Sequence, residues 1–78
     1  MVWKEIDNKL VWEYCFETFA EAFNFLNEVA RLAEEQNHHP TIYNEFTKVR
    51  LELTTHDEGH RLTELDFSFA RSIDALAR

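Results

Sequence analysis

The stretch QNHHPTIYNEFTKVRLELTTH, residues 36–56, marks the change from helix to sheet in this chain. Asn37 and Pro40 predict the end of a helix, because the residue before a proline disfavours the α region. The last part of the stretch alternates apolar and polar side chains, which is the pattern of a half-buried strand. We therefore expect residues 42–46 and 48–55 to form a β-hairpin directly after a helix.

A long helix is predicted before this stretch. Thr18 and Glu21 have the spacing of a capping box, in which the two side chains satisfy free backbone N–H groups at a helix start. The apolar residues that then recur with helical period, and that we expect to be buried, are Phe19, Ala22, Phe23, Leu26, Val29, Ala30 and Ala33. Phe25 and Leu32 lie off this stripe. They are either scattered exposed apolar residues or part of a subunit contact.

The remaining segments complete a simple order of elements. Residues 2–7 and 10–16 alternate like strands around a turn-prone Asp7-Asn8-Lys9. A second helix is expected to begin at Thr63, which forms a capping pair with Asp66. Its expected buried residues are Leu65, Phe69, Ile73 and Leu76. The order ββαββα predicts one α+β domain over residues 1–78, a four-stranded antiparallel sheet with both helices on one face.

Composition limits the classes of function. Eight basic and fifteen acidic residues give a net charge of −7, which opposes direct binding to nucleic acid or to an anionic membrane. The single Cys15 cannot form an internal disulfide, and no leader or membrane-length apolar run is found, so we expect a soluble cytoplasmic protein. Two Trp, two Tyr and seven Phe are many large apolar groups for 78 residues, so we expect a homodimer or tetramer.

Three histidines stand at element ends. His38 and His39 follow the first helix and His56 ends the fourth strand, so the hairpin would bring the three imidazoles to one rim of the sheet. Imidazole suits proton transfer near neutral pH, because its ordinary pKa is about 6.5. Glu34 lies one helical turn before His38 and could orient that ring. Alternatively, His38 and His39 only form a polar helix terminus and His56 only begins a loop. Asp66 would then only cap the second helix.

A zinc site is a further possibility, because His56-Asp-Glu-Gly-His60 resembles a distorted HExxH motif. That motif needs both histidines on one helical face with a glutamate base between them. Asp57 stands in the glutamate position, and Gly59 opposes a helix. We therefore predict no metal site.

One spaced motif joins these residues. Its members are Glu34, His38, His39, Pro40, Phe46, His56 and Asp66. With the helical and strand residues around them, over residues 3–77, they resemble the pterin-4a-carbinolamine dehydratase family. The resemblance implies the same ββαββα fold and the dehydration of 4a-hydroxytetrahydropterin to quinonoid dihydropterin, which follows the aromatic amino acid hydroxylases. It also implies a small-molecule pterin as the substrate and a reaction that needs no metal or organic cofactor.

The resemblance also implies roles for single residues. His38, His39 and His56 would be the catalytic set, in which His38 and His56 exchange protons and His39 chiefly holds the substrate. The residues implied to line the substrate pocket with them are Pro40, Thr55, Asp57 and Glu58, and those implied to support it are Glu34 and Asp66. Some family members also act as protein-binding modules that stabilise the dimer of a homeodomain transcription factor. A non-catalytic interaction module, which binds a polypeptide through its helical face or a sheet edge, is therefore the alternative function.

Overall fold

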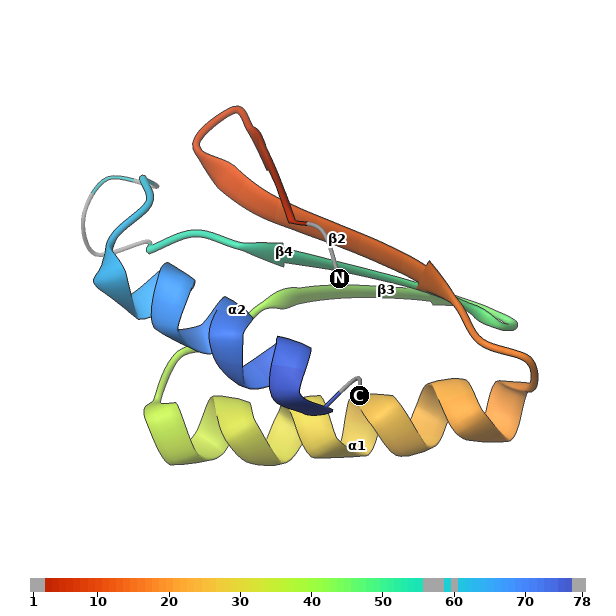
Figure 1. The fold of residues 1–78 in the computed structure, drawn as a ribbon. Helices are drawn as coiled ribbons and strands as arrows, with labels where there is room; N and C mark the ends of the chain where they lie inside the picture. Colours follow the sequence, from red (N-terminus) through yellow and green to blue (C-terminus); the bar gives the residue numbers. More distant parts are fainter. Residues whose placement is uncertain (1–2, 56–58, 60, 77–78) are drawn as a thin grey trace.

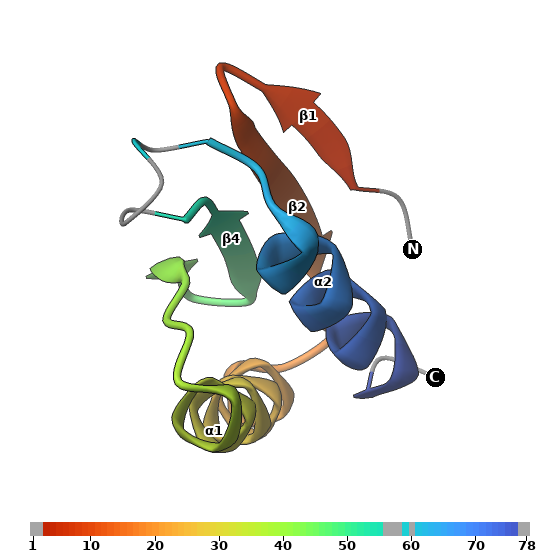
Figure 2. The same cartoon turned by 90° about the vertical axis from the view of Figure 1, so that its left-hand side faces the viewer.

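The computed structural model describes residues 3–55, 59 and 61–76. Their elements, in chain order, are β1 (Lys4–Ile6), β2 (Lys9–Cys15), α1 (Phe19–Gln36), β3 (Thr41–Glu45), β4 (Lys48–Leu53) and α2 (Glu64–Leu76) (Figure 1). The strands form one antiparallel sheet in the order β1-β2-β4-β3. Both helices cover the same face of this sheet, as the two views show (Figures 1 and 2). The predicted α+β fold and the ββαββα order are confirmed.

The two hairpin turns use left-handed backbone at residues other than glycine. Asp7 and Asn8 have φ angles of 51° and 62°, as two-residue turns between twisted strands require. Phe46, which we expected at the end of a strand, lies in the β3–β4 turn with a φ of 51°. The Asn44 side chain bridges that turn, because its amide donates to the carbonyl oxygens of Phe46 (3.2 Å) and Lys48 (3.0 Å).

Strand β4 fixes the two faces of the sheet. Its alternate residues Val49, Leu51 and Leu53 are fully buried toward the helices. In register with Leu51, Trp12 of β2 reaches the same core. The buried apolar core as a whole consists of Leu10, Trp12, Ala22, Phe25, Leu26, Val29, Ala33, Val49, Leu51, Leu53, Phe69, Ala70 and Ile73. On the opposite face lie charged side chains such as Glu13, Arg50 and Glu52, together with the buried Val11.

Helix α1 begins and ends where its sequence predicts. The Thr18 hydroxyl accepts a hydrogen bond from the backbone N–H of Glu21 (3.1 Å). Asn37 adopts the left-handed conformation, and its N–H and that of His38 both point to the carbonyl oxygen of Ala33. This C-cap turns the chain out of the helix at His38.

The buried face of α1 differs from the expected one. Phe25 is buried and stacks on Trp12 at 5.1 Å between ring centroids, whereas Phe19 and Phe23 are 48% and 47% exposed. The centre of the face is Ala22, Leu26, Val29 and Ala33, as predicted. Apolar side chains lie on both sides of this central stripe on the helix surface. The helix buries the side that carries Phe25 and exposes the side that carries Phe19 and Phe23. The interpretation of Phe25 as exposed or as a subunit contact is therefore wrong.

Helix α2 shows a similar shift by one residue. Leu65, expected inside, is 53% exposed, and the neighbouring Asp66 is fully buried. Phe69 and Ile73 are buried as predicted. The helix is also tied to the start of β1, because the Trp3 indole N–H donates to a carboxylate oxygen of Asp74 (3.1 Å). Within the described part of the chain, no helix is both long and apolar enough to cross a membrane.

Candidate functional site

The carboxylate of Asp66 is the centre of a buried polar network. Its Oδ2 accepts hydrogen bonds from the backbone N–H of Thr63 (3.0 Å) and the hydroxyl of Thr55 (2.7 Å). Its Oδ1 lies 2.7 Å from Nε2 of His38. The bond from Thr63 confirms the predicted capping pair at the start of α2. The same carboxylate also joins the end of β4 and the end of α1, which the sequence did not predict.

The hydrogen bond to this carboxylate fixes the ring of His38 in the interior of the domain. Only 9% of the residue is exposed, and its ring meets the edge of Phe69 at 6.1 Å between centroids. An ionised carboxylate can only accept hydrogen bonds, so the Nε2 of His38 must carry the hydrogen. In the neutral ring, Nδ1 then carries the lone pair. The network thus selects one tautomer of His38, in which Nδ1 is the ring nitrogen able to accept a proton.

From helical spacing we expected Glu34 to orient His38, and this prediction is wrong. Glu34 pairs with His39 instead, at 2.6 Å between Oε2 and Nε2, and both side chains are exposed. The cause is the left-handed Asn37, which ends the helix before His38 and so removes the regular spacing on which the prediction rested. The two adjacent histidines therefore have different partners, one carboxylate in the interior and one at the surface.

Thr55 closes the end of β4 against the start of α2. Its backbone N–H donates to the carbonyl oxygen of Arg61 (3.1 Å), and its hydroxyl lies 2.7 Å from that of Thr63. The residue is 5% exposed. Pro40 is half-buried in the connection from α1 to β3. The residues His56, Asp57, Glu58 and His60 lie outside the described part, so the convergence of three histidines stays a prediction.

No group of three or more His, Cys, Asp or Glu side chains suited to a metal ion is found in residues 3–55, 59 and 61–76. The motif from His56 to His60 falls largely outside these ranges. The described site therefore consists of one histidine–aspartate pair, one histidine–glutamate pair and the two threonines that brace the aspartate.

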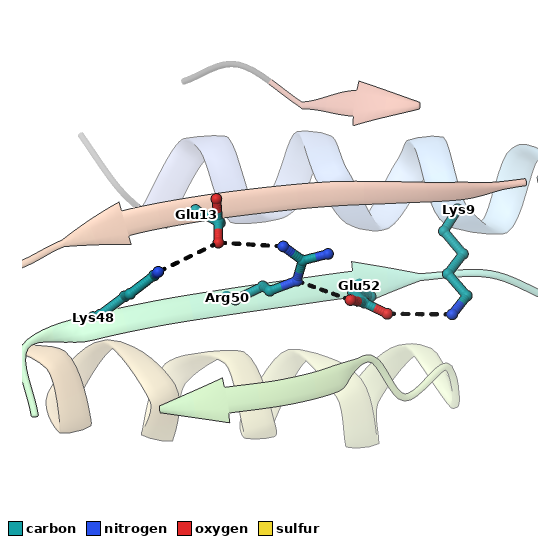
Figure 3. A network of polar contacts seen from close by, with 5 residues as sticks. All are labelled: Lys9, Glu13, Lys48, Arg50 and Glu52. Atoms are coloured by element: carbon teal, nitrogen blue, oxygen red, sulfur yellow. Dashed lines mark hydrogen bonds and ion pairs between the residues drawn. The ribbon is translucent and has the colours of Figure 1, made fainter. Parts of the chain in front are cut away.

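A second polar region, which the sequence reasoning missed, lies on the outer face of the sheet (Figure 3). Arg50 bonds Glu13 (3.2 Å) and Glu52 (2.8 Å), and Lys9 bonds Glu52 (3.3 Å). The hydrogen bond from Arg50, helped by Lys9, lowers the pKa of Glu52 although burial acts in the opposite direction. A hollow of about 370 Å³ lies beside this network, lined by Glu13, Tyr43, Asn44, Glu45, Lys48 and Arg50.

The hollow is separate from the histidines. Five of the six lining residues, all but Asn44, are out of step with the core-facing residues of β2 and β4 or pair with residues that are, so they lie on the face of the sheet away from α1 and α2. Glu13 already pairs with both Arg50 and Lys48 across the strands. The His38–Asp66 pair therefore lies apart from this hollow.

Known proteins match this chain over nearly all its length. A family model described as Pterin 4 alpha carbinolamine dehydratase matches residues 1–76. A protein of Synechococcus sp. strain WH7803, provisionally named pterin-4-alpha-carbinolamine dehydratase, is 47% identical over 74 residues, which cover 95% of this chain and 78% of the relative. A protein of Thermomicrobium roseum with the same provisional name is 45% identical over 75 residues, covering 96% and 80% of the two chains.

Two solved structures share the fold. The crystal structure of a transcriptional coactivator/pterin dehydratase from Brucella melitensis has a TM-score of 0.91 at 35% identity and covers 97% of this chain and 82% of that one. A pterin dehydratase-like protein identified as a RuBisCO assembly factor in the alpha-carboxysome has a TM-score of 0.83 at 31% identity, with coverages of 99% and 90%. The family model and the relatives lead to one conclusion: the chain belongs to the pterin-4a-carbinolamine dehydratase family, a family of lyases.

Proposed function

We propose that this protein dehydrates 4a-hydroxytetrahydropterin to quinonoid dihydropterin by histidine acid–base catalysis. The observation that carries the proposal is the 2.7 Å contact between His38 and the buried Asp66, in a chain of this family. A histidine held in one tautomer beside a fixed carboxylate is arranged for directed proton transfer. The substrate would come from the aromatic amino acid hydroxylases, whose reaction leaves the pterin hydroxylated at C4a.

The reaction needs two proton transfers. The bond from C4a to the hydroxyl oxygen breaks, the oxygen takes a proton and leaves as water, and a ring nitrogen of the pterin loses a proton. In our proposal the Nδ1 of neutral His38 takes the proton from the ring nitrogen, and protonated His56 supplies the proton to the leaving hydroxyl. No oxidant, metal or organic cofactor enters this balance.

The other motif residues are proposed to bind the substrate. His39 is exposed, and its contact with Glu34 places the hydrogen on Nε2, as in His38. Its ring is therefore accessible to a heterocycle that approaches the end of α1. Pro40, Asp57 and Glu58 are proposed to complete the pocket.

Steady-state kinetics of alanine variants test these roles. His38→Ala and His56→Ala should lower kcat by about 10²–10⁴-fold with little change in KM, because proton transfer is strongest in the transition state. His39→Ala should raise KM by about tenfold, since it removes binding felt by ground and transition states alike. His60→Ala, outside the motif, is the matched control and should behave like the wild type, as should the wild type in excess chelator. Wild-type kinetics in all three motif variants would refute the mechanism.

A second candidate is a non-catalytic interaction module. The RuBisCO assembly factor shares this fold at a TM-score of 0.83, and in the present chain all five residues of the edge strand β3 are exposed. An exposed sheet edge is a common way to add a strand from another polypeptide. A protein that does not dehydrate the pterin, but whose mass rises with a bound polypeptide, would support this alternative.

A further inference from the structure

We propose that Thr55 is a positioning residue, whose hydroxyl holds Asp66 in the orientation that selects the tautomer of His38. As a statement about catalysis the inference rests on the proposed function, whereas its structural part concerns His38 alone. The resemblance implied that Thr55 binds substrate. Its contacts instead point inward, to Asp66 and Thr63.

Only one assignment of donors and acceptors is consistent with the hydrogen bonds of this network. The hydroxyl of Thr55 has one hydrogen, and the Asp66 carboxylate has none to give, so Thr55 donates to Oδ2 at 2.7 Å. The hydroxyl of Thr63, 2.7 Å away, must then donate to the oxygen of Thr55. The chain of donors therefore runs from Thr63 through Thr55 to Asp66, and ends at the carboxylate that faces His38.

This arrangement restrains the rotation of the carboxylate. Oδ2 is held by two donors, the Thr55 hydroxyl and the Thr63 N–H, which leaves Oδ1 directed at the Nε2 of His38. Asp66 is fully buried, so water cannot replace a lost donor without a rearrangement. Without the Thr55 hydroxyl, Oδ2 keeps only the Thr63 N–H, so rotation about the Cβ–Cγ bond is less restrained and His38 is less strictly confined to the Nε2–H tautomer.

Thr55 has little capacity left for a substrate. The residue is 5% exposed, its hydrogen is donated to Asp66, and a lone pair accepts from Thr63. The backbone bridge from Thr55 to Arg61 does not depend on the side chain. A substitution of the side chain therefore tests the hydroxyl separately from the strand pairing.

The neighbouring threonine offers a matched control. Thr54 is also buried, but its hydroxyl donates to the carbonyl oxygen of Asn8 (3.1 Å), in the β1–β2 turn. Thr55→Val and Thr54→Val each replace a buried hydroxyl by a methyl group of similar size. Only Thr55→Val removes a donor from Asp66, and Thr55→Ser restores it.

The experiment is nitrogen-15 NMR of the histidine rings in the free full-length protein, together with steady-state kinetics. We expect His38 to be the Nε2–H tautomer in the wild type, Thr55→Ser and Thr54→Val, and a mixture of tautomers in Thr55→Val. We also expect Thr55→Val to lower kcat by about 10–100-fold with an unchanged KM, by analogy with the loss of groups that orient metal-bound histidines. Thr54→Val should keep its kcat.

Several results would overturn the inference. An Nδ1–H tautomer in the wild type would do so without any variant, and therefore even if Thr55→Val did not fold. An unchanged tautomer in a folded Thr55→Val would also contradict it, as would an equal loss of kcat in Thr54→Val or a rise in KM alone. If the wild type lacked dehydratase activity, the proposed function would fail, and the tautomer of His38 would still decide whether Thr55 positions the ring.

Discussion

At the scale of single residues, the chain places a carboxylate where solvent cannot reach it. Burying a charged group costs several kcal/mol unless hydrogen bonds replace its hydration. Asp66 receives them from the hydroxyl of Thr55, the N–H of Thr63 and the ring of His38. Each donor comes from a different part of the chain. The site is therefore built by the same contacts that hold the start of α2 against the end of α1.

The ion pairs of Glu52 predict how the stability of the fold depends on pH. Because the pKa of Glu52 is lowered in the folded state, its contribution to stability is complete above its unfolded pKa of about 4.5 and is lost as pH falls through the lower folded value. Glu52→Gln should therefore lower the free energy of unfolding by at most about 1 kcal/mol at pH 7. The difference from the wild type should vanish at a pH below both values.

Urea denaturation at several pH values measures this. Glu45→Gln, at an exposed position on β3, is the control and should lose less stability at pH 7. A deficit of Glu52→Gln that persisted unchanged in acid would contradict the assignment to the ion pairs with Arg50 and Lys9.

At the scale of elements, helix α1 makes the sharpest prediction. Phe25 packs between Trp12 and Phe16, with ring centroids 5.1 and 5.2 Å away, whereas Phe23 is half exposed beside Phe19. Phe25→Ala should lower the free energy of unfolding by about 3–5 kcal/mol, because it leaves a cavity in the core. Phe23→Ala should cost less than about 1 kcal/mol. Equal losses in chemical denaturation would contradict the observed face of the helix.

The sequence predicted the elements better than their contacts. Capping at Thr18 and Asn37 and the alternation in β4 are local signals, and each appears in the structure. The choice between Phe23 and Phe25 is not local, because it depends on where the sheet lies beneath the helix. Leu65 was misplaced for the same reason, since the capping residue Asp66 is the one that turns inward.

The candidate site was predictable only in part. The motif named His38, His39 and Asp66, but the partner of each histidine depends on how the chain leaves the helix at Asn37. The pairing of His38 with Asp66 spans 28 residues, and no periodic pattern connects them. The inward direction of the Thr55 hydroxyl likewise depends on the placement of α2 against β4.

At the scale of the whole molecule, large apolar side chains remain at the surface. They include Phe19, Phe23, Ile42, Tyr43 and Phe46. Phe25 and Leu32, in which we had looked for a subunit contact, belong to or pack against the core. The proposal of a homo-oligomer therefore rests on other residues than those first considered.

Light scattering of the purified protein tests that proposal. We predict a mass of at least twice the 9.3 kDa of one chain at micromolar concentration, since exposed aromatic surface of this extent favours self-association. A single species of monomer mass under these conditions would contradict it. The proposed catalytic network of His38, Asp66 and Thr55 lies within one chain, so activity of a monomer would not affect the mechanism.

The most direct test of the central claim is the decay of 4a-hydroxytetrahydropterin followed by ultraviolet absorbance, with and without the protein. The account predicts that the wild type accelerates the formation of quinonoid dihydropterin, in excess chelator as well as without it. It also predicts that His38→Ala, folded as judged by circular dichroism, loses this acceleration by about 10²–10⁴-fold. A decay rate with the wild-type protein equal to that of the spontaneous reaction, or an undiminished rate with His38→Ala, would contradict the account.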